Sequence, residues 1–196
     1  MLAIKNFSCL LRWLGLALTV YVSLRAGAAI DFTPTTGERV LEGIVFKQLV
    51  FHENGHAITY EQPRGWQYSG EAARIRFTPP DFRQAQAEIV QAPLAQPQSF
   101  DDSTRKNLQA QVVGSVPPGS QNGVIIAEEQ NPLTINGKQT YAVTVGYVLS
   151  GQDYLLSVIF ANLDKTQLQF RIVARKKDFD QVTRLFRGSL FSLQWH

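Results

Sequence analysis

The five residues His52-Glu53-Asn54-Gly55-His56 spell the H-E-x-x-H pattern of zinc peptidases. In those enzymes both histidines bind one zinc ion from one face of a helix, because the helical period brings positions i and i+4 together. Here strand-like runs flank the string, and Asn54-Gly55 is a dipeptide typical of a two-residue hairpin turn. Such a hairpin places Glu53 opposite His56 and sends the two histidines to opposite faces. We therefore predict an exposed hairpin tip and no metal site.

Other catalytic patterns are missing from the sequence. It contains no G-x-S-x-G elbow and no glycine-rich nucleotide motif, and its third histidine is the last residue, His196. Asp101-Asp102 is better explained as the start of a helix. Glu128-Glu129 is a poor acid–base pair, because adjacent residues of a strand face opposite ways. No catalytic residue and no cofactor is predicted.

Two segments carry residues that are suited to binding. Arg64, Trp66 and Tyr68 lie around a loop glycine, where a tryptophan can anchor a ligand or partner; it can equally plug the end of the core. Basic residues gather near the end of the chain, where they could dock an acidic partner or an anionic surface; the alternative is a solvated helix face. The basic candidates are Arg175, Lys176 and Lys177.

The net charge of +3 is confined to the start of the chain. Residues 1–28 hold three basic residues and no acid, so 16 of the 19 Lys and Arg remain to balance 16 Asp and Glu. The remainder is formally neutral, and no aromatic platform is interleaved with the basic residues near the end of the chain, so nucleic-acid binding is not indicated. The single Cys and the single Met also lie in the first 28 residues, which excludes disulfides, Cys-zinc sites and thiol nucleophiles from the rest.

The first 28 residues read as a signal peptide. Lys5 and Arg12 precede a twelve-residue apolar run, 13–24, and Ala26-Gly27-Ala28 supplies small residues for cleavage. The run is shorter than the ~20 residues that span a bilayer, although an uncleaved anchor is the alternative. We expect an exported chain, periplasmic or secreted, that begins near Ala29 and has no stable membrane insertion after cleavage.

The remaining chain predicts a lead-in over 29–42 and a single α+β domain over 43–196. Arg74-Ile75-Arg76-Phe77 alternates as a half-buried strand does, and Phe179, Val182 and Phe186 recur at helical spacing. Short turns between consecutive strands predict antiparallel pairing. We expect one sheet of about six to eight hairpin-connected strands, covered by two or more helices. The expected strands are 43–51, 57–60, 74–78, 85–90, 123–127, 139–149, 154–161 and 167–174, with helices after Asp101-Asp102 and around 179–186.

Pro63-Arg64-Gly65-Trp66, followed by a strand over Ala73–Phe77, resembles the start of PsbP-type domains, whose fold the Ran-binding Mog-type proteins share. The closing helix, followed by Ser189-Leu190-Phe191-Ser192-Leu193, is also similar. The resemblance covers most of Ile44–Trp195 and implies an antiparallel sheet between helices, a PsbP-like sandwich. It implies no activity, since members serve as assembly, accessory or binding proteins.

These observations favour an exported, non-enzymatic binding or accessory protein of the cell envelope, acting on a protein partner or a small ligand. An enzyme of unrecognised type is the alternative, because active sites assemble from distant positions. A structural component of an envelope complex is a third possibility. A deep cleft that collects polar side chains would favour the enzyme, and a flat face would favour a protein partner.

Overall fold

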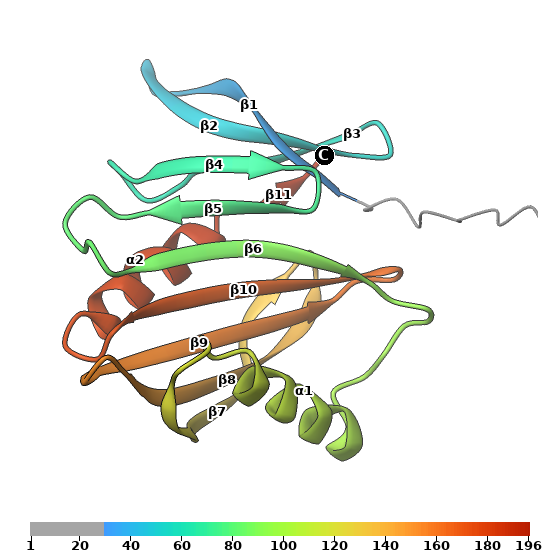
Figure 1. The fold of residues 1–196 in the computed structure, drawn as a ribbon. Coiled ribbons are helices and arrows are strands. Elements are labelled where there is room, and N and C mark those ends of the chain that lie inside the picture. Colours follow the sequence, from blue (N-terminus) through green and yellow to red (C-terminus); the bar gives the residue numbers. More distant parts are fainter. Residues whose placement is uncertain (1–29) are drawn as a thin grey trace, which may run out of the picture.

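The computed structural model describes residues 30–196, and the predicted signal peptide lies outside them. Two antiparallel sheets and two helices make up this part of the chain (Figure 1). The smaller sheet has the order β1-β2-β3-β11, and the larger has the order β4-β5-β6-β10-β9-β8-β7. The strands are β1 (Ile30–Leu41), β2 (Ile44–Glu53), β3 (His56–Tyr60), β4 (Gln67–Glu71), β5 (Arg74–Thr78), β6 (Gln86–Pro93), β7 (Gln121–Ile135), β8 (Lys138–Leu149), β9 (Gln152–Asn162), β10 (Thr166–Arg175) and β11 (Gln194–Trp195). The helices are α1 (Asp102–Gly114) and α2 (Phe179–Leu190).

The prediction of a single sheet is wrong. The chain leaves the smaller sheet after Tyr60 and enters the larger one at Gln67. Pro63 has no N–H to continue a ladder, and Gly65 turns the backbone at φ 81°. The two strands on either side of this turn therefore do not pair with each other. The segment predicted as a lead-in, 29–42, holds strand β1, which pairs along β2.

The two helices cover opposite faces of the larger sheet. On one face, Leu108 and Val112 of α1 pack on alternate residues of β8 and β9, among them Val143 and Val158. On the other face, α2 packs together with the smaller sheet on the opposite set of alternate residues. The alternation predicted for 74–78 is confirmed, since Ile75 and Phe77 are fully buried. Within residues 30–196 no helix combines the length and the apolar character needed to cross a bilayer.

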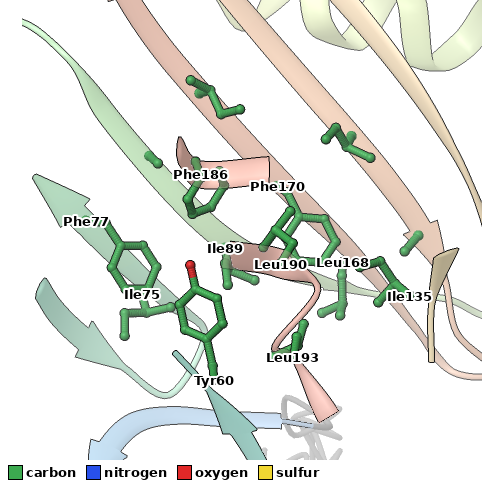
Figure 2. Close-up of a cluster of buried hydrophobic side chains, with 14 of the residues drawn as sticks. Tyr60, Ile75, Phe77, Ile89, Ile135, Leu168, Phe170, Phe186, Leu190 and Leu193 are labelled. Carbon is green, nitrogen blue, oxygen red and sulfur yellow. The ribbon is translucent and has the colours of Figure 1, made fainter. Parts of the chain in front are cut away.

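The larger of the two cores joins both sheets to α2. Figure 2 shows Tyr60 of the smaller sheet, Phe77 and Ile89 of the larger sheet and Phe186 of α2 meeting in one cluster. The Tyr60 hydroxyl lies 2.6 Å from Ser189 Oγ, so this buried polar atom has a partner. Burial raises the pKa of Tyr60. Side chains from β3, β5, β6 and α2 thus fix the two sheets against each other.

Candidate functional site

The H-E-x-x-H string forms the hairpin tip predicted from the sequence. Glu53 lies opposite His56 in the ladder and His52 lies opposite Ala57, so the histidines face opposite sides. Asn54 and Gly55 have φ values of 51° and 86°, as a type I′ turn requires. Glu53 accepts a hydrogen bond from Trp195 Nε1 at 3.0 Å. Among residues 30–196 no group of three or more His, Cys, Asp or Glu side chains is placed to hold a metal ion.

Gly55→Ala should lower the free energy of unfolding by about 1 kcal/mol, because alanine pays a steric cost at this positive φ. His52→Ala, an exposed neighbour in the same hairpin, is the matched control and should change it little. Urea denaturation measures the free energy of unfolding of both variants.

Added zinc should leave the melting temperature unchanged, because a ligand stabilises only when it binds the folded state preferentially. Submicromolar zinc binding that both His52→Ala and His56→Ala abolish would contradict the hairpin interpretation.

The two binding segments predicted from the sequence lie apart in the larger sheet, because the first leads into β4 and the second follows β10. Trp66 is only 5% exposed, and its ring stacks on Phe186 of α2 at 6.2 Å, so it fills the core. Arg64 and Tyr68 on either side of it are exposed. Arg175 ends β10, and Lys176 and Lys177 lie exposed in the turn before α2. No hydrogen bond or ion pair joins the two segments in the part of the chain that the structure describes, and a binding role for their exposed members stays a prediction.

A concave site that was not predicted from the sequence lies at the N-terminal end of α1. It is an open cleft of about 690 Å³ between the segment that leads into α1, the end of β9 and the β7–β8 hairpin. Its wall is rich in side-chain amides, supplied by Gln98, Gln130, Asn131, Gln139 and Asn162. The volume falls within the range of about 300–1,000 Å³ that is usual for small-ligand sites.

The start of α1 forms one wall of this cleft. Asp101 is the N-cap of the helix and accepts a hydrogen bond from the Thr104 N–H at 2.8 Å, as its sequence position predicted. That hydrogen bond, aided by the Ser103 hydroxyl, lowers the pKa of Asp101. One turn later, Arg105 pairs with Asp102. Across the cleft, Lys138 Nζ lies 3.1 Å from Asp164 Oδ1. The three charged side chains that line the cleft, Asp101, Arg105 and Lys138, thus each have a partner within the protein.

Phe100 and Tyr141 line the cleft, and Tyr141 also belongs to a hydrogen-bonded triad whose other two members, Glu128 and Gln109, lie outside the cleft. The rings of Phe100 and Tyr141 lie 5.8 Å apart. The Tyr141 hydroxyl donates to Glu128 Oε2 at 2.6 Å, and Gln109 Nε2 donates to the same carboxylate oxygen at 2.8 Å. Burial, followed by the hydrogen bond to Glu128, raises the pKa of Tyr141. The phenol therefore stays protonated and neutral at physiological pH.

A bulge in β7 brings the amides of the β7–β8 hairpin into the cleft. The pairing of β7 with β8 shifts register between Gln130 and Thr134, and Asn131 adopts φ 53°. Thr140, 2% exposed, replaces the missing ladder contacts by accepting from the Leu133 N–H at 3.1 Å and donating to the Leu133 carbonyl at 2.6 Å. Bulges of this kind re-aim side chains beside functional sites. Gln130 and Gln139 are exposed on either side of it.

A chain of buried amide side chains lies beside the segment that leads into α1. Asn162 Nδ2 donates to the Gln98 carbonyl at 3.0 Å, and Asn162 Oδ1 accepts from Gln167 Nε2 at 2.9 Å. Gln167 in turn accepts from Gln169 Nε2 at 3.0 Å. These three side chains are at most 9% exposed, so their mutual hydrogen bonds offset the cost of burying them. This chain of hydrogen bonds ties the segment before α1 to the end of β9 and to β10.

The adjacent acids Glu128 and Glu129 face opposite ways, as predicted. Glu128 accepts from Tyr141 on the α1 side, whereas Glu129 pairs with Arg187 of α2 on the other side at 2.7 Å. The hydrogen bond from Arg187 lowers the pKa of Glu129. The two carboxylates therefore share no site.

No known family model matches the sequence, and no curated protein matches it. Similar solved structures include the cyanobacterial PsbP of Synechocystis sp. PCC 6803, which is 14% identical, with 93% of this chain and 99% of that chain covered at a TM-score of 0.46. LpqN of Mycobacterium tuberculosis, described as involved in cell envelope biogenesis, is 14% identical, with 82% and 87% covered at a TM-score of 0.47. A Pseudomonas aeruginosa protein of unknown function is 13% identical, with 79% and 93% covered at a TM-score of 0.44.

PsbP is thus among the similar structures, in line with the resemblance expected from the sequence. At these identities the likeness concerns the fold alone. The resemblance to Mog-type proteins stays a prediction.

Proposed function

We propose that this chain is a non-enzymatic, exported binding or accessory protein that holds a neutral, hydroxyl-rich ligand of the saccharide class in the amide-lined cleft. The observation that carries the proposal is the lining of the cleft, where the exposed amide side chains of Gln98, Gln130 and Gln139 lie around the partly exposed ring of Phe100. An amide side chain both donates and accepts hydrogen bonds, as a sugar hydroxyl does. One amide can therefore satisfy two neighbouring hydroxyls at once.

The charges of the cleft support a neutral ligand. Asp101 caps α1, Arg105 pairs with Asp102, and Lys138 pairs with Asp164. Each of these charges therefore already has a partner of the opposite sign or a hydrogen bond within the protein, and none is left unpaired for a charged ligand. The same arrangement supports binding over catalysis, since general acids, bases and nucleophiles must be available to the substrate. The partly exposed ring of Phe100, which rests on the buried Tyr141, offers an apolar surface to the C–H face of a sugar ring.

Gln130 and Gln139 are the amides best placed to test the proposal, because both are exposed in the cleft and neither side-chain amide has a hydrogen-bond partner among residues 30–196. Binding can be screened with neutral oligosaccharides built from glucose, galactose, mannose and N-acetylglucosamine, and measured by calorimetry. The double variant Gln130→Ala/Gln139→Ala should weaken binding roughly tenfold, since each lost hydrogen bond is worth about 0.5–1.5 kcal/mol. Gln111→Ala, an exposed amide of α1 outside the cleft, is the matched control.

Three results would contradict this function. The first is that none of the neutral oligosaccharides binds at millimolar concentration. The second is that uronate- or phosphate-bearing sugars bind more tightly than neutral ones. The third is that the Gln111→Ala control weakens binding as much as the double variant does.

A further inference from the structure

The turn of the β1–β2 hairpin exposes apolar side chains that belong to neither core. Val40, Leu41, Ile44 and Val45 are 66%, 52%, 59% and 53% exposed. The turn between them is made by Glu42 and Gly43 at φ 51° and 80°. In Figure 1 this end of β1 and β2 stands free of the other elements. We name these four apolar residues the apolar tip.

The apolar tip carries its side chains on both faces of the hairpin. Val40 lies opposite Val45, and Leu41 lies opposite Ile44. Because successive residues of a strand point to opposite faces, each face receives one apolar pair. A protein that lies against one face would leave the other pair in water. A medium that surrounds the hairpin covers both.

Charged and aromatic residues lie directly behind the apolar tip. Arg39 is opposite Phe46, and Glu38 is opposite Lys47. The Arg39 guanidinium lies 5.8 Å from the centre of the Phe46 ring and is also paired with Glu61 at 2.9 Å. Lys47 is exposed and has no ion pair among the described residues. Basic side chains behind an apolar end can reach phosphates while the apolar residues enter the hydrocarbon boundary.

From this arrangement we propose that the apolar tip docks on a phospholipid bilayer, entering the boundary between headgroups and acyl chains. Two residue pairs extend about 7 Å along a hairpin, which matches the depth of about 5–10 Å at which interfacial segments lie. Glu38 and Glu42 balance Arg39 and Lys47, so docking requires no anionic lipid. The contact is peripheral and reversible, and it is independent of the ligand in the cleft.

A fluorophore at the tip tests this proposal in the full chain. Cys9→Ser removes the natural cysteine, and Val45→Cys provides a single attachment site for an environment-sensitive dye. His56→Cys is the matched control, since His56 is exposed at the start of β3, opposite Glu53 at the far end of β2 and about 26 Å from Val45. Vesicles of neutral phosphatidylcholine should shift the emission of the Val45 label to the blue and leave that of the His56 label unchanged. Soluble phosphocholine should shift neither, which separates a bilayer from its headgroup.

Two further variants decide whether the tip itself makes the contact. Leu41→Asn/Ile44→Asn should abolish the shift of the Val45 label, and its melting temperature should match the parent because both positions are exposed. Glu42→Gln should tighten binding several-fold, because the carboxylate at the turn no longer has to approach the hydrocarbon. The proposal is overturned if the Val45 label does not shift, if it shifts as the His56 label does, if the shift survives in the double variant, or if Glu42→Gln weakens binding.

Discussion

Trp66→Ala should lower the free energy of unfolding by about 3–5 kcal/mol, the usual cost of removing a buried aromatic side chain. Trp66 is 5% exposed, and its ring stacks nearly parallel on Phe186, with an angle of 6° between them. Phe186 in turn contacts Phe77 of the larger sheet, at 5.9 Å between ring centres. Loss of the indole would leave a cavity between the β3–β4 segment and α2.

Tyr68→Ala is the control for this prediction, because Tyr68 is 40% exposed and lies two residues away in the same segment. Its free energy of unfolding should stay close to that of the parent, and both variants can be compared by urea denaturation. If Trp66→Ala proved as stable as the parent, the residue would not hold the core. Its prediction as a ligand anchor would then regain support.

Gly70→Ala should destabilise the fold by about 3 kcal/mol, although it adds a single methyl group. A Cβ at position 70 would collide with the Phe32 carbonyl oxygen and would lie 2.7 Å from Pro34 Cδ. Both obstacles belong to β1, which crosses β4 at this point, so the collision is with backbone and a ring, neither of which can rotate away. β1 would have to move off β4 to make room.

Gly188→Ala is the matched control for Gly70→Ala. A Cβ at Gly188 meets no atom within 4 Å, and the residue lies in α2, where alanine favours the helix over glycine. The control should therefore be as stable as the parent or slightly more stable. Thermal unfolding of the two variants side by side gives the answer, and equal melting temperatures would show that β1 does not rest on β4 as described.

The parts of the fold that were predictable from the sequence are those whose burial follows a period. Phe179, Val182 and Phe186 are buried on one face of α2, and Leu108 and Val112 are buried on α1, as their spacing indicated. The Asn54-Gly55 turn was predictable because the dipeptide itself suits positive φ. In each case a local preference and the tertiary structure agree.

Strands β1 and β4 were missed because their sequences lack that periodicity. β1 contains Pro34 and Gly37, which are typical of loops, yet a register shift between Asp31 and Thr35 lets the ladder pass the proline. β4 has the sequence Gln-Tyr-Ser-Gly-Glu, is largely exposed and lies at the edge of its sheet. Edge strands need no alternating apolar residues, since only part of their surface is buried.

The cleft could not be predicted from local spacing. Gln98, Gln130, Gln139 and Asn162 come from four separate segments, and only the packing of β7, β8, β9 and α1 brings them together. The one local signal was Asp101-Asp102, which marked the helix start that forms its wall. An exposed amide in a sequence carries no period and no charge pattern, so nothing distinguishes Gln130 from the solvated glutamines elsewhere.

The most direct measurement of the central claim is a titration of the full chain, labelled with nitrogen-15, with the neutral oligosaccharides, followed through its side-chain amide signals by NMR. The proposed function predicts that at least one neutral oligosaccharide shifts the signals of Gln130 and Gln139 in a saturable manner, while the signal of Gln111 stays in place. These assignments follow from the loss of single signals in the corresponding alanine variants. If every oligosaccharide left the Gln130 and Gln139 signals unchanged, or shifted only amides outside the cleft, the amide-lined cleft would not be the binding site.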